Sequence, residues 1–451
     1  MISKEVFRAY DIRGQYPNEI NEEFAYRLGR AFVDFLRTKK GPHGGRILVN
    51  RDTRGSSKSL TESLMKGIIE GGVGVFDGGV STSPMHYFGV GTYDVDGGIM
   101  VTASHSGAGS NGFKLSTKTE RIAENNGLSD IYKIMEREFL PGTLGAVQNL
   151  DYIDAYANYL KKFSIASKFA PSPHVVVDAS GGSAAAVLEK ILPLLPIKAE
   201  KIFFDIDPLF SAHNPNPLLP ESQKMIQEKL KSEHFDFGAI FDADGDRVIF
   251  FDGSGRMIPS DYIAALIAED KLLQKPEGKV LLDISSSKKS REYIEKKGGV
   301  VEVVRVGTAF FRNALEKDTT ILLGAESSGH YYYPELFNND GAALTLIYVL
   351  NTVAKRGKSL GECVEPLRAF YRSGELNFTV PDKKKTLQRV KENFPSGKII
   401  FIDGITIEFK DWWFNIRPSN TDPVLRLHIE ANTEELMNEK KALLEGLIKK
   451  E

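Results

Sequence analysis

The chain has 451 residues, a length that predicts about two to four domains. Hydrophobic residues make up 41 % of the chain and charged residues 26 %, which is the composition of a folded protein rather than a disordered one. Lys and Arg (58) nearly balance Asp and Glu (60) for a net charge of −2, which disfavours a nucleic-acid partner because such proteins present a basic face. The single cysteine, Cys363, excludes an intramolecular disulfide and a cysteine-rich zinc site. No apolar run reaches the roughly 18 residues of a membrane helix, and the first residues lack a signal-peptide core, so we expect a cytoplasmic protein with no membrane partner.

Three segments share one pattern, in which a β-branched run is followed by an Asp and then by a Gly- or Ser-rich turn. These segments are Arg46–Ser57, His174–Ala184 and Lys279–Lys289. A helical pattern follows each of them, and after the first and the third a further strand pattern appears, at Gly74–Phe76 and Val300–Val304. Strand, helix and strand in succession make a βαβ unit, which favours parallel sheet. We therefore expect three related α/β domains with mixed sheets that contain βαβ units.

The last part of the chain predicts a smaller α+β domain. Lys398–Phe401 and Ile405–Phe409 flank Asp403-Gly404, which is a strong hairpin signal. Two more strand patterns and an amphipathic closing helix follow, and we expect Asn432 to cap that helix. The expected domains span residues 1–150, 151–253, 254–367 and 368–451.

The string Gly98–His105 predicts a strand that runs into a loop in which Ser104 stands beside His105. Glycines further along the loop leave room for a close backbone approach. Serine is a weak nucleophile until it is activated, and a phosphorylated Ser104 would carry about −1.5 to −2 charges. By itself, a Ser-His pair in a glycine-rich loop is more often a turn than a catalytic site.

Asp242, Asp244 and Asp246 alternate with small residues directly after an apolar strand. Carboxylates so close together repel one another unless a cation lies among them, and hard oxygen ligands favour Mg²⁺. An EF-hand that begins at Asp242 needs Gly and Glu at its sixth and twelfth positions, where this chain has Arg and Gly. An acidic turn in solvent is the simpler alternative. A phosphate on Ser104 would supply the further oxygen ligand that such a metal site needs.

A short loop after the strand pattern Ile321–Leu323 contains Glu326, Ser328 and His330. A carboxylate and a hydroxyl together can accept from and donate to neighbouring sugar hydroxyls. The alternative is a turn in which Glu326 serves as a helix cap.

The string Arg417–Arg426 has an arginine at each end of a loop of hydroxyls, an amide and backbone N–H groups. Guanidinium groups match the geometry of a phosphate dianion, and neutral donors can fill its remaining lone pairs. A polar hairpin loop with no ligand is the alternative. Gly107–Gly112 fits the letters of the dinucleotide-binding motif, but no helix pattern follows it, and the sequence has no P-loop. We therefore expect a phosphorylated small metabolite as the partner, and neither NAD nor ATP.

With these four strings in chain order, the sequence resembles the α-D-phosphohexomutase superfamily, and within it most closely the bacterial and archaeal phosphomannomutase/phosphoglucomutase branch. The resemblance covers essentially the whole chain, including the opening Phe7–Gly14. It implies four domains around a central cleft, in a monomer or a homodimer. It also implies an isomerase that interconverts hexose 6-phosphate and hexose 1-phosphate through a phosphoserine and a bisphosphorylated sugar, with Mg²⁺ as the metal and hexose 1,6-bisphosphate as activator and intermediate.

The same resemblance implies roles for individual residues. The phosphoserine position is Ser104, which has His105 beside it, and the metal ligands are Ser104, Asp242, Asp244 and Asp246. The residues that match cleft positions used for catalysis are Arg13, Lys114, Arg247 and His330. The residues that match contacts to the sugar and to its distal phosphate are Tyr10, Glu326, Ser328, Arg417, Ser419, Asn420, Thr421 and Arg426.

Two positions depart from the family pattern. Ser106-Gly107 replaces an Asn-Pro dipeptide, which frees the backbone of the serine loop, and Thr308 stands where the family has a histidine. Phosphoglucosamine mutase shares the four loops and is the alternative enzyme, because Ser327 in the sugar loop is compatible with either activity. A non-catalytic sugar-phosphate-binding protein on the same scaffold is the alternative from another class.

Overall fold

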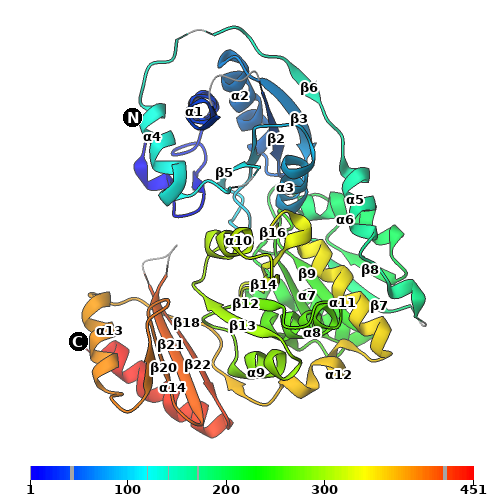
Figure 1. The fold of residues 1–451 in the computed structure, drawn as a ribbon, viewed down its shortest axis with the longest axis vertical. Helices are drawn as coiled ribbons and strands as arrows, with labels where there is room; N and C mark the ends of the chain where they lie inside the picture. The colour runs from blue at the N-terminus through cyan, green and yellow to red at the C-terminus, as the bar shows by residue number, and fades with distance from the viewer. Residues whose placement is uncertain are drawn as a thin grey trace. The chain divides into compact units, whose positions relative to one another are not determined.

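A computed structural model of the chain describes residues 2–40, 45–118, 120–140, 142–169, 172–419 and 424–450. The chain forms two compact units, whose elements are labelled in Figure 1. The first unit comprises Met1–Ser260, Arg312–Thr319 and Ser328–Cys363, and the second comprises Asp261–Phe311, Thr320–Ser327 and Val364–Glu451. Within the described residues, no helix has both the length and the apolar character needed to cross a membrane.

The first unit begins with a six-stranded mixed sheet in the order β1-β5-β4-β2-β3-β6. Its strands are β1 (Ile12–Gln15), β2 (Arg46–Arg51), β3 (Gly74–Val80), β4 (Gly97–Val101), β5 (Ser110–Thr117) and β6 (Val147–Asn149). β2 is parallel to β3 and β4, whereas β5 is antiparallel to β4 and β1. The helices of this part are α1 (Glu22–Lys40), α2 (Ser57–Glu70), α3 (Ser83–Thr92) and α4 (Ser129–Met135).

Helices α1 and α2 approach each other closely because each has a glycine at the contact. A Cβ atom on Gly29 would lie 2.3 Å from the carbonyl oxygen of Leu64, and one on Gly67 would lie 2.1 Å from that of Tyr26. Either distance is a clash, so only glycine permits this crossing.

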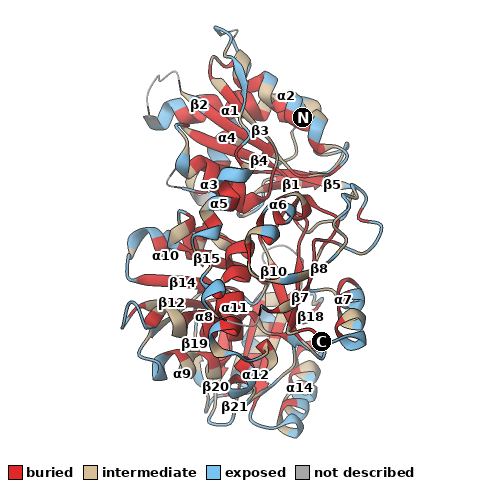
Figure 2. Ribbon diagram, turned by 90° about the vertical axis from the view of Figure 1, so that its right-hand side faces the viewer, coloured by how far each residue is buried: buried red, intermediate tan, exposed pale blue. Residues whose placement is uncertain are grey.

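The first unit also contains a five-stranded mixed sheet in the order β11-β10-β9-β7-β8. Its strands are β7 (His174–Asp178), β8 (Lys198–Ile202), β9 (Phe237–Phe241), β10 (Val248–Asp252) and β11 (Met257–Ile258), and its helices are α5 (Ile153–Lys161), α6 (Ser183–Ile191) and α7 (Pro220–Ser232). β7 is parallel to β8 and β9, and β10 runs antiparallel to β9. Every residue of β9 and β10 is buried. Figure 2 colours the buried residues of the chain red. The hairpin β15 (Tyr331–Tyr333) and β16 (Asn339–Asp340) and the buried helix α11 (Ala342–Arg356) complete this unit.

The second unit contains the strands β12 (Lys279–Asp283), β13 (Val300–Val304) and β14 (Ile321–Ala325) and the C-terminal sheet. β12 is parallel to β13 and to β14. The helices associated with these strands are α8 (Ser260–Leu272), α9 (Lys288–Lys296), α10 (Thr308–Lys317) and α12 (Leu360–Val364), of which α8, α10 and α12 include residues of both units. The C-terminal sheet is antiparallel, with β17 (Tyr371–Arg372), β18 (Leu376–Phe378), β19 (Lys398–Ile400), β20 (Ile405–Glu408), β21 (Trp412–Pro418) and β22 (Leu425–Ala431), and it is accompanied by α13 (Lys383–Glu392) and α14 (Glu434–Lys449).

The predicted fold class is confirmed. Each repeated segment forms the expected strand and helix, so that β2-α2-β3, β7-α6-β8 and β12-α9-β13 are three βαβ units with parallel strands, and the C-terminal part is a smaller α+β structure. The predicted cap of the closing helix is wrong. Thr433 caps α14 by accepting from the N–H of Leu436, whereas the side chain of Asn432 donates to Asp411.

Candidate active site

The serine loop connects β4 to β5 and begins at the carboxyl end of β4, the side on which open α/β sheets bind ligands. Ser104 is buried in it, with a left-handed backbone (φ 51°) that is uncommon for a residue with a side chain. Its N–H donates a 2.9 Å hydrogen bond to Thr102 Oγ1. The backbone of this serine is therefore held by the loop itself.

The aspartate loop connects β9 to β10 and contains Asp242, Asp244 and Asp246. Oδ1 of Asp242 accepts from the N–H groups of Asp246 and Arg247, at 3.0 and 3.1 Å. Gly245 makes the turn possible, because its φ of 67° is left-handed and a Cβ atom there would lie 2.8 Å from Thr82 Cγ2. The turn brings ligand oxygens of the three carboxylates to within 4.8 Å of one another.

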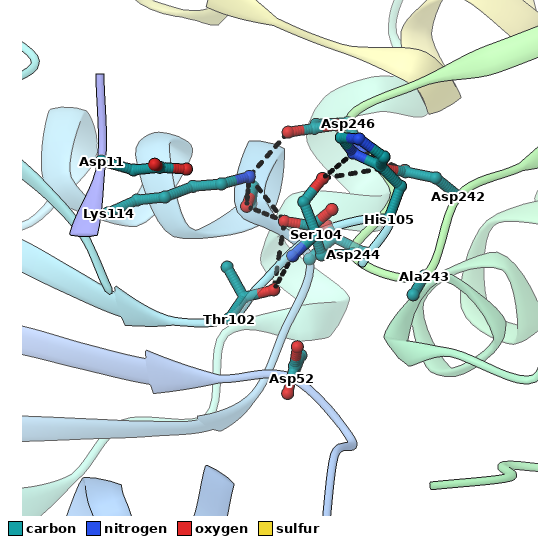
Figure 3. Close-up of polar contacts among 12 residues, drawn as sticks. Asp11, Asp52, Thr102, Ser104, His105, Lys114, Asp242, Ala243, Asp244 and Asp246 are labelled. Carbon is teal, nitrogen blue, oxygen red and sulfur yellow. Dashed lines mark hydrogen bonds and ion pairs between the residues drawn. The ribbon is translucent and has the colours of Figure 1, made fainter. Parts of the chain in front are cut away.

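The serine loop and the aspartate loop meet inside the first unit. The hydroxyl of Ser104 donates to Oδ2 of Asp242 at 3.0 Å, and the hydroxyl of Thr102 is 3.4 Å from Oδ2 of Asp244. Figure 3 shows Ser104 pointing toward the aspartates and Lys114 reaching them from β5. Two motifs from different sheets are thus combined into one polar cluster.

Lys114 is buried at 2 % exposure with its ammonium between two aspartates. It donates to Oδ2 of Asp244 at 2.6 Å, to Oδ2 of Asp246 at 2.7 Å and to the hydroxyl of Ser83 at 2.9 Å. Burial opposes its charge, but the carboxylates of Asp244 and Asp246 raise the pKa of Lys114 above its ordinary value. All three of its protons are therefore engaged.

The acidic triplet fits a hard divalent cation. Oδ1 of Asp244 and Oδ1 of Asp246 are buried and have no hydrogen-bond partner, which is costly for a carboxylate unless a cation satisfies it. Burial, followed by the charges of Asp246 and Asp244, holds the pKa of Asp242 well above its usual value. Three carboxylates are the oxygen donors that Mg²⁺ or a similar ion takes.

His330 lies at the edge of this cluster. Its Nδ1 is 3.4 Å from Oδ2 of Asp340 and 3.8 Å from Oδ1 of Asp246, and its Nε2 accepts from Nε of Arg247 at 2.9 Å. Because Nε2 is an acceptor, a neutral ring carries its proton on Nδ1, facing the two carboxylates. Arg247 and His330 are thus part of the site in which the sequence predicts them.

His105 and Arg13 contact the serine loop. Nδ1 of His105 is 3.3 Å from the Ser104 hydroxyl, and burial together with the charges of Arg247 and Arg13 holds the pKa of His105 well below its ordinary value. Arg13, on β1, donates to the hydroxyl of Ser106 at 3.1 Å and to Asp11 at 2.6 Å. Tyr10 is half-buried in the segment just before β1.

The residues predicted to contact the sugar belong to both units. Glu326 is buried in the second unit, directly after β14, and its Oε1 accepts from the N–H of Gly307 at 2.7 Å. Next to it, Ser327 donates its N–H and its hydroxyl to Oδ2 of Asp283, at 2.7 and 2.8 Å. Ser328 is half-buried and is assigned to the first unit.

The two arginines of the C-terminal loop are cross-strand neighbours, since Arg417 on β21 pairs in register with Arg426 on β22. Both guanidinium groups lie 3.4 Å from carboxylate oxygens of Glu375. Ser419 is half-buried, and its N–H donates to the carbonyl oxygen of Val424. The predicted residues Asn420 and Thr421 lie outside the described residues.

Several residues of the site are missing from the sequence-based prediction. Thr102, Ser83 and Asp340 contact the predicted residues directly, and Glu375 pairs with both arginines. Arg54 is the most extensively bonded of these, because it donates to the backbone of the serine loop at four carbonyl groups. The one sequence signal for Arg54 is its place in the Asp-Thr-Arg turn that follows β2.

Four family models match the chain in succession. They are described as phosphoglucomutase/phosphomannomutase alpha/beta/alpha domain I (residues 4–141), domain II (151–255), domain III (259–370) and C-terminal domain (375–445). A phosphomannomutase from Methanocaldococcus jannaschii is 36 % identical over 450 residues, which cover 99 % of this chain and 98 % of that protein. One from Escherichia coli K12 is 33 % identical over 438 residues, 94 % of each chain. A crystal structure of a phosphoglucomutase/phosphomannomutase family protein from Burkholderia thailandensis superimposes with a TM-score of 0.91 at 27 % identity, covering 100 % of this chain and 98 % of that one.

Proposed function

Because the chain belongs to the phosphoglucomutase/phosphomannomutase family, we propose that it interconverts hexose 6-phosphate and hexose 1-phosphate, of mannose, glucose or both, with Ser104 as the phosphoryl carrier. In the first half of the reaction the Oγ–P bond of phosphorylated Ser104 breaks and the free hydroxyl of the sugar phosphate gains the phosphoryl group. The resulting hexose 1,6-bisphosphate returns its other phosphoryl group to Ser104. The names of the relatives, phosphomannomutases above all, support mannose and glucose over glucosamine.

One observation carries this proposal, namely the 3.0 Å hydrogen bond from the Ser104 hydroxyl to Asp242 within the buried acidic triplet. Phosphoryl transfer asks little covalent chemistry of a protein and depends on positioning and charge stabilisation. The fixed position of Ser104 beside the acidic triplet provides the positioning. The charged residues around it provide the charge stabilisation.

We assign the metal ligands to Asp242, Asp244 and Asp246, with an oxygen carried by Ser104 as the fourth, and Mg²⁺ as the ion. When bound, Mg²⁺ would neutralise charge on the transferring group. The Oδ1 atoms of Asp244 and Asp246, which accept no hydrogen bond, support this assignment.

The surrounding side chains have separable roles in the proposal. Lys114 acts as a fixed positive charge, because all three of its N–H groups are held by Ser83 and two aspartates. His330 lies between Arg247 and Asp340. It is better placed than Lys114 to transfer a proton, because its ring takes part in only one hydrogen bond. His105 and Arg13 border the serine loop and contact the transferring group.

In the rest of the chain, Glu326 and Ser328 would read the sugar hydroxyls, with Tyr10 as a further contact. Arg417 and Arg426 would bind the phosphate that is not transferred, with Ser419, Asn420 and Thr421 as neutral donors. The carboxylate of Glu375 pairs with both arginines, so a phosphate there would take over contacts that Glu375 now makes. We also propose the division into four domains at residues 1–150, 151–253, 254–367 and 368–451, which the succession of four family models supports. A cytoplasmic location is a further part of the proposal.

The test is an assay of the purified chain with the 1-phosphates of mannose, glucose and glucosamine, Mg²⁺ and a trace of hexose 1,6-bisphosphate. We expect turnover of mannose or glucose phosphate and a phosphoryl group on Ser104 by mass spectrometry. Ser104→Ala should lower turnover by at least about 1,000-fold, as loss of a nucleophile does, whereas Ser110→Ala, at the first residue of β5, should keep it. Glucosamine phosphate as the best substrate would indicate the alternative mutase, and binding without turnover would indicate a sugar-phosphate-binding protein.

A further inference from the structure

Arg54 follows β2 and is buried at 2 % exposure. Its Nη2 donates to the carbonyl oxygens of Ser104 and Ser106, both at 2.6 Å, and its Nη1 donates to those of Gly107 at 2.7 Å and Ser110 at 3.1 Å. The Nε–H donates to Asp52 at 2.9 Å. A guanidinium group has five N–H donors, so every donor of Arg54 is used within the protein and none is left for a ligand.

The guanidinium group is itself held on two further sides. Asp52 accepts from the Arg54 side chain through Oδ2 and from the Arg54 backbone N–H through Oδ1, which also accepts from the Ser57 hydroxyl. The ring of Phe210, from the part of the unit that holds the aspartate loop, lies 5.0 Å from the guanidinium carbon. The guanidinium group of Arg54 is therefore held in a fixed position, from which it binds the backbone of the serine loop.

The hydrogen bonds of Arg54 restrain the part of the serine loop in which the backbone is strained or flexible. Ser104 has the left-handed backbone, a conformation that a residue with a side chain keeps only when its surroundings impose it. The Ser106-Gly107 dipeptide that follows lacks the stiffness of a proline, and the carbonyl groups of both residues are among those that Arg54 binds. The side chain thus immobilises the backbone on the C-terminal side of the serine.

We propose that Arg54 is a positioning residue that holds Ser104 in the conformation from which its hydroxyl meets the aspartate loop. The proposal rests on the proposed role of Ser104 as phosphoryl carrier. The side chain of Arg54 contacts Asp52, the ring of Phe210 and the backbone of residues 104–110, and it acts through that backbone. A lysine cannot replace it, because an ammonium has three donors and no planar fork.

The test compares Arg54→Lys and Arg54→Ala with the same changes at Arg30. Arg30 is a matched control in the first unit: it is buried, donates to the carbonyl oxygens of Glu70 and Leu140, and lies over a ring, that of Phe139, at 5.2 Å. For Arg54→Lys we expect kcat to fall about 100-fold, the effect of misplacing a reacting group by about 1 Å, with KM for the hexose phosphate within about threefold. Phosphorylation of Ser104 by hexose 1,6-bisphosphate should slow by the same factor as kcat. Arg30→Lys should keep both rates.

Three outcomes would overturn the assignment: kcat of Arg54→Lys within threefold of the parent, an equal loss in Arg30→Lys, or a rise in KM at unchanged kcat, which would make Arg54 a ligand-binding residue. Amide hydrogen exchange separates this proposal from the function on which it rests. Arg54→Lys should speed exchange in residues 104–110 more than elsewhere, whatever the parent catalyses, and unchanged exchange there would also overturn it. A parent with no turnover and no phosphate on Ser104 would instead refute the proposed function alone.

Discussion

The hydroxyl of Ser104 lies 3.0 Å from Oδ2 of Asp242, a residue 138 positions further along the chain. Each of the two stands just after a buried strand, Ser104 after β4 and Asp242 after β9, and each follows the carboxyl end of that strand. The contact joins the two halves of the proposed site, so removing the carboxylate tests the metal assignment directly.

We expect Asp242→Asn to lower the apparent Mg²⁺ affinity by at least about tenfold and kcat by at least about 100-fold, because the ion's contribution to charge stabilisation amounts to several kcal/mol. The measurement is mutase activity over a Mg²⁺ titration. Asp252→Asn is the control, since Asp252 is a buried carboxylate at the far end of the same hairpin, where it binds Ser254 and Arg256. A Mg²⁺ dependence that is equal in the two variants would contradict the metal assignment.

Lys114 lies between Asp244 and Asp246 and offers a second test that needs no turnover. Lys114→Met leaves two buried carboxylates without their cation, and we expect a loss of about 3–5 kcal/mol in the free energy of unfolding when Mg²⁺ is chelated. Added Mg²⁺ should raise the melting temperature of this variant more than that of the parent, because the ion then replaces the missing charge.

Lys229 provides the matched control for Lys114. It also binds two carboxylates, those of Glu200 and Glu233 at 2.6 and 2.7 Å, but on the surface, where solvent screens an ion pair and its contribution to stability is small. Lys229→Met should therefore cost little and leave the Mg²⁺ response unchanged. The same Mg²⁺ response in Lys114→Met as in the parent would refute the shared site for the ammonium and the metal.

Gly107 replaces a proline of the family pattern, and its conformation allows a side chain. Its φ is not positive, and a Cβ atom there meets nothing within 4 Å. Gly107→Ala should stabilise the protein by about 0.4–1 kcal/mol because it restricts the unfolded chain, and the urea midpoint should rise.

Gly79→Ala controls for the φ angle alone. Its Cβ atom would also meet nothing within 4 Å, but its φ is +66°, so the substitution should cost about 1–2 kcal/mol. Equal shifts in the two variants would show that Gly107 has a strained backbone as well.

The first strand of each βαβ unit could be predicted from local sequence because its apolar run is buried on both faces. The run Lys279–Asp283, for example, forms β12 with its last four residues buried. The cap of α14 could not be predicted from local sequence, because Asn432 and Thr433 are both residue types that cap helices. What decides between them is a tertiary contact, since both the backbone N–H and the side chain of Asn432 bond to Asp411.

The residues proposed to carry the chemistry can be recognised in short sequence motifs, but the residues that hold them in place cannot. The aspartates and Ser104 are recognisable because their spacing is a requirement of the chemistry. The contacts of Arg54 and Glu375 depend instead on which segments the fold brings beside them, from 42 to 56 positions away, and no local pattern encodes that. Lys114 was predicted as a cleft residue, yet its engagement by two aspartates is visible only once the fold is known.

The side chains of His213 and Asp178 form a buried pair in the first unit. Nε2 of His213 is 3.3 Å from Oδ2 of Asp178, and Nδ1 is 2.7 Å from the carbonyl oxygen of Asn214. With acceptors at both nitrogens, the doubly protonated ring is favoured. Burial opposes the charge, but the hydrogen bond to Asp178 and its negative charge hold the pKa of His213 above its ordinary value of 6.5.

The sign of the pH dependence follows from that shift. A histidine whose pKa is raised in the folded state stabilises fully below about pH 6.5, and the stabilisation is lost as the pH rises through the raised pKa. His213→Gln should therefore be less stable than the parent by about 1.5–3 kcal/mol at pH 6, the range for a hydrogen bond to a charged group, and the difference should shrink as the pH is raised above 6.5. Melting temperatures across this range provide the measurement. His86→Gln is the control with the opposite sign. Burial lowers the pKa of His86 to about 3, so only the unfolded chain takes up a proton at this position near pH 6, and the loss of stability in His86→Gln should grow as the pH is raised to 6.5 and above. A His213→Gln difference that does not shrink over the same range would mean that the pair carries no charge.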